Sequence, residues 1–119
     1  MKDFIKVMKA LSDETRLRML NVLLVRGCCV CEIMQALDIS QSRASRNLSI
    51  LQDAGFLKAK RDGTWIIYSI DWQTANHYAT SLVKAIRKTF EGNEVVAKDR
   101  ERLKKAERIG PGCVRKSMK

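Results

Sequence analysis

VCEIMQALDISQSRASRNLSILQDAG, residues 30–55, joins two helical patterns through a short turn. Asp38 and Ile39 form the turn, and Ser40 is a good N-cap for a second helix that ends at Gly55. In the first part, apolar side chains recur at i, i+3, i+4 and i+7, as on the buried face of a helix. These side chains are Val30, Ile33, Met34 and Leu37. The stretch therefore predicts two helices in direct succession.

The second of these helices separates an apolar face from a polar and basic one. Ala44, Leu48 and Leu51 face inward. Two helices joined by a turn of about four residues or fewer, the second beginning polar and basic, are typical of a DNA-binding helix-turn-helix. The exposed face supplies candidates for base-edge contacts and for a phosphate contact. The base-edge candidates are Gln41, Ser42, Arg43 and Ser45, and the phosphate candidate is Arg46.

FLKAKRDGTWIIYSI, residues 56–70, follows directly and predicts a β-hairpin. Both halves are rich in alternating or β-forming residues, and Asp62-Gly63 between them is a strong signal for a two-residue hairpin loop. A hairpin that follows a recognition helix is a wing. We expect the basic side chains of this wing to contact DNA phosphates. They are Lys58, Lys60 and Arg61.

Further helical patterns flank this region on both sides. Residues 3–9 predict a short helix, and Ser12 is expected to cap a second helix that stops at Gly27. Residues 72–90 predict a long final helix. The fold class is therefore mainly α with a β-hairpin, arranged as a winged helix-turn-helix.

The charge pattern divides the chain into two parts. We expect a DNA-binding and dimerisation domain over residues 1–92 and a basic C-terminal extension over 93–119. The extension holds much of the positive charge, and we expect it to be helical up to Arg108 and partly disordered beyond.

The overall composition narrows the class of partner. The 119 residues include 23 Lys and Arg against 13 Asp and Glu, a net charge of +10, which favours a polyanion such as nucleic acid. The N-terminus does not resemble a signal peptide, and no apolar run is long enough to cross a bilayer. We therefore expect a cytoplasmic protein with no membrane partner. A single histidine far from the cysteines and the lack of a glycine-rich phosphate loop argue against an enzyme or an organic cofactor.

Three of the four cysteines lie within four positions, and this density indicates a site. They are Cys28, Cys29 and Cys31, and the fourth is Cys113. In a reducing cytosol, clustered cysteines are more often metal-binding or catalytic than disulfide-bonded. Thiolates select soft ions, whereas Mg²⁺ and Ca²⁺ need oxygen ligands. Arsenite and antimonite form three bonds, so three nearby thiols match their valence.

The spacing of the cysteines restricts how such a site can form. At about 100° per residue of regular helix, Cys28 and Cys31 share a face, whereas Cys29 and Cys31 point nearly opposite ways. A three-thiol site therefore requires the segment to be unwound at its start, or to unwind when the ion binds. Gly27 makes that start easier to deform.

Three stretches resemble the ArsR/SmtB family of metal-responsive winged-helix repressors, in the order in which the family has them. KALSDETRLRMLNVL, residues 9–23, is similar to the family's opening signature. ISQSRASRNLSILQDAGFL, residues 39–57, is similar to its recognition helix. CVCEI, residues 29–33, resembles the Cys-Val-Cys-Asp-Leu-Cys box of its arsenite-responsive members. The resemblance covers about residues 5–90.

This resemblance implies a homodimer held by the first and last helices. It also implies double-stranded operator DNA as the partner, bound without ligand and released when the ligand binds. Two recognition helices in a dimer would read an inverted repeat. The expected effector is arsenite or antimonite, bound by Cys28, Cys29 and Cys31, with Cys113 as a further candidate ligand.

The chain departs from the family pattern at several positions. Met34 replaces the third cysteine of the box, and Asn47 and Ala44 replace the usual His and Val of the recognition helix. Asp71 and His77 alone do not make up the family's zinc-type site on the last helix.

Several readings stay open at the level of the sequence. The cysteines could serve a redox or persulfide sensor of the same fold, or a sensor of cadmium or lead. They could also be buried filler in a nonspecific nucleic-acid-binding module that has no ligand. Neither the inducer nor the operator follows from the sequence.

Overall fold

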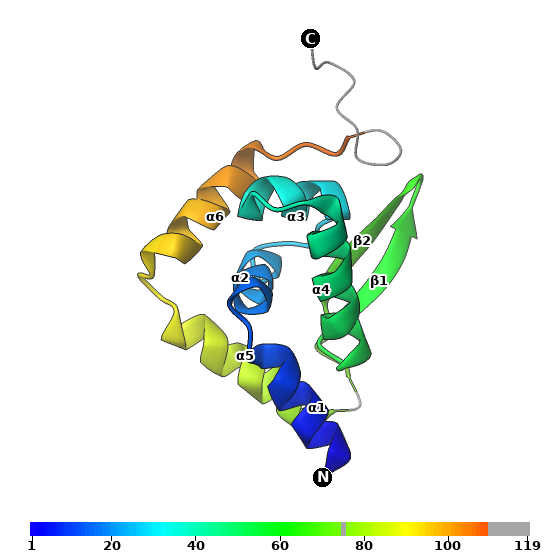
Figure 1. The fold of residues 1–119 in the computed structure, drawn as a ribbon, viewed down its shortest axis with the longest axis vertical. Helices are drawn as coiled ribbons and strands as arrows, with labels where there is room; N and C mark the ends of the chain where they lie inside the picture. The colour runs from blue at the N-terminus through cyan, green and yellow to red at the C-terminus, as the bar shows by residue number, and fades with distance from the viewer. Residues whose placement is uncertain (75, 110–119) are drawn as a thin grey trace.

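The computed structural model describes residues 1–74 and 76–109, which form six helices and one hairpin (Figure 1). In chain order these are α1 (Lys2–Leu11), α2 (Glu14–Leu23), α3 (Val30–Leu37), α4 (Gln41–Asp53), β1 (Leu57–Asp62), β2 (Trp65–Ile70), α5 (His77–Thr89) and α6 (Glu94–Lys105). The α2 helix lies at the centre, and the other helices and the hairpin surround it. The order of elements confirms the predicted winged helix-turn-helix.

The core is built around α2, because six of the ten residues of that helix are buried. Met19, Leu20 and Val22 are fully buried and belong to one continuous apolar cluster with residues of α3, α4 and α5. The predicted cap of α2 was wrong by one residue. Asp13 is the N-cap and accepts a hydrogen bond from the Arg16 backbone N–H, whereas the Ser12 hydroxyl donates to the Met8 carbonyl at the end of α1.

The two helices of the helix-turn-helix lie where predicted, although α4 ends at Asp53, before Gly55, and Val30 and Met34 on the predicted buried face of α3 are only half-buried. Ser40 caps α4 by accepting from the Arg43 backbone N–H at 3.2 Å. Asp38 ends α3 in the left-handed conformation, with φ of 58°, which turns the chain sharply toward α4. The inward side chains of α4 are buried as predicted. They are Ala44, Leu48 and Leu51.

The hairpin forms, but its loop lies one residue later than predicted. Asp62 pairs with Trp65, so the two loop residues are Gly63 and Thr64. Gly63 has φ of +64°, which a hairpin loop with glycine first requires and which β-branched Thr64 would adopt only with strain. The predicted Asp62-Gly63 loop was wrong because cross-strand pairing extends through Asp62.

The C-terminal half differs most from the sequence-based expectation. The last predicted helix does not begin at residue 72, because Asp71 and Thr74 accept short-range side-chain hydrogen bonds from the Gln73 and Asn76 backbone N–H groups. These contacts hold a turn, and α5 begins at His77. The predicted continuation to Phe90 is nearly met, since α5 ends at Thr89.

Residues 94–105 form α6, which packs against both α2 and α3. Asp99 on this helix is fully buried and receives two hydrogen bonds at 2.8 Å from Arg18 of α2 and one at 2.7 Å from Arg102. The helix ends at Lys105, three residues before the predicted end at Arg108. The described part of the basic extension is therefore bound to the helix-turn-helix.

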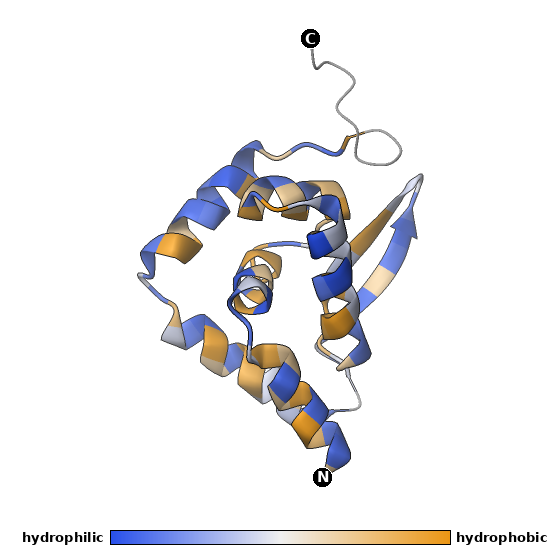
Figure 2. Cartoon of the chain, viewed as in Figure 1, coloured by the Kyte–Doolittle hydropathy of each residue, from blue (hydrophilic) through white to orange (hydrophobic). Residues whose placement is uncertain are grey.

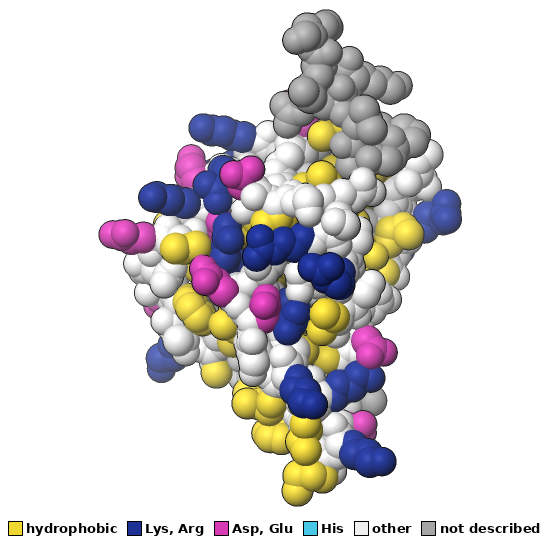
Figure 3. Space-filling model, in the orientation of Figure 1, with side chains coloured by type: hydrophobic (Ala, Val, Ile, Leu, Met, Phe, Trp, Pro, Cys, Tyr) yellow, Lys and Arg dark blue, Asp and Glu magenta, His cyan; other side chains and the backbone are white. Residues whose placement is uncertain are grey.

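An apolar surface lies at the end of the molecule where α1 and α5 run side by side (Figures 1 and 3). The side chains of α1 that form it, Phe4, Ile5 and Met8, are 41–46% exposed. The centroid of the Phe4 ring lies 5.3 Å from that of the Tyr78 ring on α5, in an edge-to-face contact. Hydrophobic residues recur along both helices, whereas α6 is mainly hydrophilic (Figure 2). In the part of the chain that the structure describes, no helix is long and apolar enough to span a membrane.

Candidate functional site

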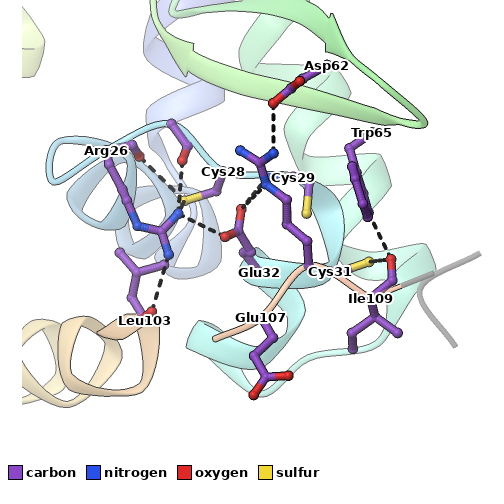
Figure 4. Close-up of polar contacts among 12 residues, drawn as sticks. Arg26, Cys28, Cys29, Cys31, Glu32, Asp62, Trp65, Leu103, Glu107 and Ile109 are labelled. Atoms are coloured by element: carbon purple, nitrogen blue, oxygen red, sulfur yellow. Dashed lines mark hydrogen bonds and ion pairs between the residues drawn. The ribbon is translucent and has the colours of Figure 1, made fainter. Parts of the chain in front are cut away.

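Cys28 lies in the extended segment between α2 and α3 and is fully buried. Its backbone pairs with Tyr68 of β2 through two hydrogen bonds, of 2.9 Å and 2.8 Å, so this residue extends the hairpin by one bridge. The side chain points toward Arg26, whose guanidinium lies 3.9 Å from Sγ (Figure 4). Burial raises the pKa of the Cys28 thiol to about 12, which the charge of Arg26 only partly offsets. The thiol is therefore protonated at neutral pH.

Cys29 is the N-cap of α3, and Glu32 completes a capping box with it. The Glu32 carboxylate accepts from the Cys29 backbone N–H at 2.9 Å, and the Cys29 side chain accepts from the Glu32 backbone. Glu32 is 5% exposed, and its other oxygen accepts from Arg26 at 2.9 Å. Burial also raises the pKa of Cys29. A change at Cys29 therefore breaks contacts that hold the first turn of α3.

Cys31 lies in the first turn of α3 and points toward the segment that follows α6. Its Sγ is 3.8 Å from the carbonyl oxygen of Ile109 (Figure 4). The same segment is bound to Gln35, one turn further along α3, by hydrogen bonds to Glu107. Cys31 thus lies in the first helix of the helix-turn-helix and also contacts the C-terminal segment.

The sulfur atoms of this cluster do not converge in the described structure, in which Cys28 and Cys29 are free thiols and Cys31 is disulfide-bonded. Cys28 points to Arg26 and Cys31 to Ile109, whereas Cys29 points toward neither (Figure 4). Among residues 1–74 and 76–109, no three His, Cys, Asp or Glu side chains are arranged to hold a metal ion. The donor atoms suit a soft ion, but a shared site requires the start of α3 to change shape. Cys113 lies outside the described residues.

The predicted nucleic-acid contacts on α4 all remain at least partly accessible. Gln41, Ser42, Arg43 and Arg46 are exposed, and Ser45 is half-buried. The wing candidates Lys58, Lys60 and Arg61 are exposed on β1. A cleft of about 570 Å³ lies along this strand and is also lined by Arg108. The structure thus leaves all eight predicted side chains accessible to some degree.

Two hydrogen bonds that the sequence did not indicate fix α4 against α2. Arg43 donates to the Thr15 hydroxyl at 2.8 Å. Arg16 donates to the Asn47 side chain at 2.7 Å and also to the carbonyl groups of Ala10 and Lys9 at the end of α1. Arg16 and Asn47 therefore connect α1 to the recognition helix. The two residues are 31 positions apart, so no local pattern could have revealed the pair.

Arginines of α2 and α6 add contacts at the other end of α3. Arg102 donates to the Ala36 carbonyl at 2.8 Å, and Arg18 donates to the Leu37 carbonyl at 3.0 Å. These carbonyl groups end α3 and have no partner within the helix. The arginines therefore fix the last turn of α3 directly before the turn into α4.

Comparison with known proteins identifies related sequences. The family described as "Bacterial regulatory protein, arsR family" matches residues 13–59. The "Arsenic resistance transcriptional regulator ArsR1" of Pseudomonas putida is 43% identical over 65 residues, which cover 54% of this chain and 51% of that protein. The "Cadmium resistance transcriptional regulatory protein CadC homolog" of Staphylococcus aureus is 39% identical over 70 residues, or 58% of each chain.

A third relative matches over more of its length. The "Arsenical resistance operon repressor" of Bacillus subtilis is 34% identical over 87 residues, which cover 71% of this chain and 83% of that protein. The chain spans little more than half the length of the first two relatives.

Solved structures share the fold. The transcriptional repressor BigR from Xylella fastidiosa superposes with a TM-score of 0.66 at 26% identity, over 78% of this chain and 88% of that one. A homodimeric winged helix-turn-helix DNA-binding domain from Mycobacterium bovis has a TM-score of 0.64 at 27% identity, over 78% and 82%.

Proposed function

Because this chain belongs to the arsR family of bacterial regulatory proteins, we propose that it is a cytoplasmic transcriptional repressor whose DNA binding is controlled by a thiophilic ion. It binds an inverted-repeat operator as a homodimer and releases it when arsenite or antimonite binds. The observation that carries this proposal is the position of the cysteines. Cys29 and Cys31 lie at the first turn of α3, the first helix of the helix-turn-helix, and Cys28 is hydrogen-bonded to the wing.

The DNA-binding part of the proposal rests on the exposed face of α4. Gln41, Ser42, Arg43 and Ser45 read base edges in the major groove, and Arg46 with Lys58, Lys60 and Arg61 contacts phosphates. Arg43 is oriented by its hydrogen bond to Thr15, which limits the entropy that is lost when it contacts DNA. The apolar surface of α1 and α5 supplies the dimer contact, as the family resemblance implies.

The choice of arsenite or antimonite as the effector rests on the number of sulfur atoms that the cysteines can supply as ligands. Arsenous acid condenses with three thiols and releases three water molecules, so its bonding demand is three sulfur atoms. Cys29 and Cys31 supply two of these, and Cys28 or Cys113 supplies the third. Burial and the raised pKa of Cys28 make it slow to react without rearrangement. Cys113 follows Ile109 by four residues, a span of up to about 14 Å, and Ile109 lies against Cys31.

Release follows from what the cysteines hold in place. Cys29 precedes α3 in extended backbone, so the segment is already unwound there, and an ion shared with Cys31 draws the Cys29 side chain away from the Glu32 backbone and breaks the capping box. Moving Cys28 strains its two backbone hydrogen bonds to Tyr68 in the wing. Only the undistorted form presents α4 and the wing together to DNA. A coupling of about 3 kcal/mol between the two states weakens DNA binding about 150-fold.

Native mass spectrometry after arsenite treatment tests the effector site. We expect one arsenic per chain with three thiols consumed, and loss of binding when Cys29 and Cys31 are both replaced by serine. Cys28→Ala and Cys113→Ser then identify the third ligand. Arsenic bound equally well by the Cys29→Ser, Cys31→Ser double variant would refute the assignment.

Two related readings are separate outcomes of the same experiment. The Staphylococcus aureus relative is named for cadmium resistance, so Cd²⁺ is titrated in parallel. If Cd²⁺ consumes the thiols and arsenite does not, the protein is a cadmium-type sensor. The contact of Cys31 with Ile109 also favours a redox pair with Cys113, and loss of thiols to peroxide without any ion identifies that case.

A further inference from the structure

The four residues that follow α6, 106–109, lie between α3 and the hairpin (Figures 1 and 4). We call this segment the strap. It leaves α6 at Lys105, continues in extended conformation from Ala106, and reaches the tip of the wing at Ile109. Within residues 1–74 and 76–109, no backbone pairing with α3 or with the hairpin holds the strap, and side-chain contacts fix its position.

The strap is bound to α3 by paired hydrogen bonds to Gln35 and by a 4.0 Å ion pair between Arg108 and Glu32. The Gln35 amide donates to the Glu107 carbonyl at 2.7 Å and accepts from the Glu107 backbone N–H at 3.1 Å. The same amide nitrogen also donates to the Cys31 carbonyl at 2.9 Å. Gln35 therefore connects the strap to the backbone of residues 28–31, which we call the cysteine turn.

The other end of the strap is bound to the wing. The Trp65 indole N–H donates to the Ile109 carbonyl at 2.8 Å. Arg108 forms a 2.7 Å ion pair with Asp62 and lies 5.7 Å above the Trp65 ring. Asp62 and Trp65 are cross-strand partners that flank the hairpin loop, so both contacts hold the tip of the wing.

The carbonyl group of Ile109 links the cysteine turn to the wing. The Ile109 carbonyl oxygen accepts from Trp65 and lies 3.8 Å from Cys31 Sγ. A change in the position of Cys31 therefore displaces an atom that is bonded directly to the wing. This connection is separate from the backbone bridge of Cys28 to Tyr68, which reaches β2 nearer its middle.

We propose that the strap transmits the state of the cysteine turn to the tip of the wing, with Gln35 and Trp65 as its positioning residues. With the cysteine turn intact, the strap holds the hairpin at the angle at which Lys58 and Lys60 face DNA. When the turn is distorted, Ile109 moves and the hairpin tip is released. The ion that causes the distortion is that of the proposed function, but the restraint on the wing exists in the protein alone.

Trp65 provides a direct reporter, because the chain has only one other tryptophan, Trp72. In a full-length Trp72→Phe protein, tryptophan emission reports the indole that bonds to Ile109. Sodium arsenite and CdCl₂ are added while thiols are counted in parallel. We expect the Trp65 emission to shift as thiols are consumed, and Gln35→Met in this background to reduce the shift at least threefold. Gln52→Met, the same change at an exposed residue of α4, leaves the shift intact.

Hydrogen exchange of the hairpin amides tests the restraint without any ion. Loss of one strap contact, by Gln35→Met or by Trp65→Phe, is expected to speed exchange of the β1 and β2 amides nearest the loop about tenfold. Gln52→Met leaves their exchange unchanged. Equal exchange rates of the hairpin amides in all of these proteins would refute the proposal that the strap restrains the wing. Consumption of thiols with no shift of Trp65 emission would refute it as well. If no ion consumes thiols, the proposed function fails, and the exchange rates alone decide on the strap.

Discussion

Cys28 and Cys29 are adjacent in the sequence, but their surroundings give them different roles. Cys28 behaves as a core residue that is paired with β2, and Cys29 caps a helix. Burial raises the pKa of both thiols, so neither is a ready nucleophile while α3 is intact. Reaction of the site with an ion therefore depends on a change in the backbone before or during binding.

The protonated Cys28 thiol predicts a specific pH dependence of stability. Below pH 9.0, its ordinary pKa, the thiol is neutral in both the folded and the unfolded chain. As pH rises toward about 12, the unfolded thiol ionises while the folded one keeps its proton, so the free energy of unfolding falls. The loss approaches about 1.4 kcal/mol per pH unit.

Urea denaturation under reducing conditions at pH 8, 9 and 10 measures this effect. The stability advantage of the wild-type protein over Cys28→Ala should shrink as pH rises through this range. A constant difference between the two proteins at all three values would show that Cys28 does not hold its proton in the folded state.

Residue roles that depend on local spacing could be predicted from the sequence. Ser40 was identified as the N-cap of α4 because a capping residue acts on N–H groups only two or three positions later. Glu32 follows Cys29 by three positions, which is the spacing of a capping box, but cysteine is not among the usual capping residues. The pairing of Arg16 with Asn47 joins distant positions and could not be predicted.

At the scale of elements, α6 stabilises the helix-turn-helix from outside. Its buried Asp99 is neutralised by Arg18 and Arg102, and these arginines also donate to the last carbonyl groups of α3. The sequence predicted a helix up to Arg108 but not its packing against the helix-turn-helix, because the one acid that is buried cannot be distinguished from its exposed neighbours by composition. Residues 18 and 99 are 81 positions apart, so only the tertiary structure brings them together.

Breaking this buried cluster should destabilise the protein strongly. Asp99→Asn leaves the half-buried Arg18 guanidinium without its carboxylate, and we expect a loss of about 3 kcal/mol in the free energy of unfolding. Glu101→Gln is the matched control on the same helix, because Glu101 forms only an exposed 3.4 Å pair with Lys104. That change should cost less than about 0.5 kcal/mol. Equal losses for the two variants in urea denaturation would show that α6 does not support the fold through Asp99.

At the scale of the whole molecule, the exposed apolar surface of α1 and α5 supports the proposed dimer. Aliphatic and aromatic side chains that are nearly half exposed on one face of a short helix are costly to leave in water. The structural relative from Mycobacterium bovis is described as homodimeric. The family resemblance implied a dimer contact through the first predicted helix and the predicted helix over residues 72–90, which correspond to α1 and α5. Family membership also agrees with the expectation of a regulator and not an enzyme.

Charged substitutions in this surface should separate the dimer. We expect Ile5→Glu combined with Met8→Glu to sediment as a monomer at micromolar concentration, because burying two carboxylates in an apolar contact is unfavourable. Lys2→Glu, at the start of the same helix, should remain dimeric. A dimer that persists in the double variant would place the interface elsewhere.

The operator titration tests the central claim, that an ion at the start of α3 controls DNA binding, most directly. A DNA duplex selected by the protein from a randomised pool is labelled, and its anisotropy is followed as protein is added with and without arsenite. We predict that arsenite weakens binding of the wild-type protein by one to two orders of magnitude. The Cys29→Ser, Cys31→Ser double variant should bind the same DNA and give superimposable curves with and without arsenite. If arsenite releases DNA equally from that variant, the cysteines of α3 are not the effector site.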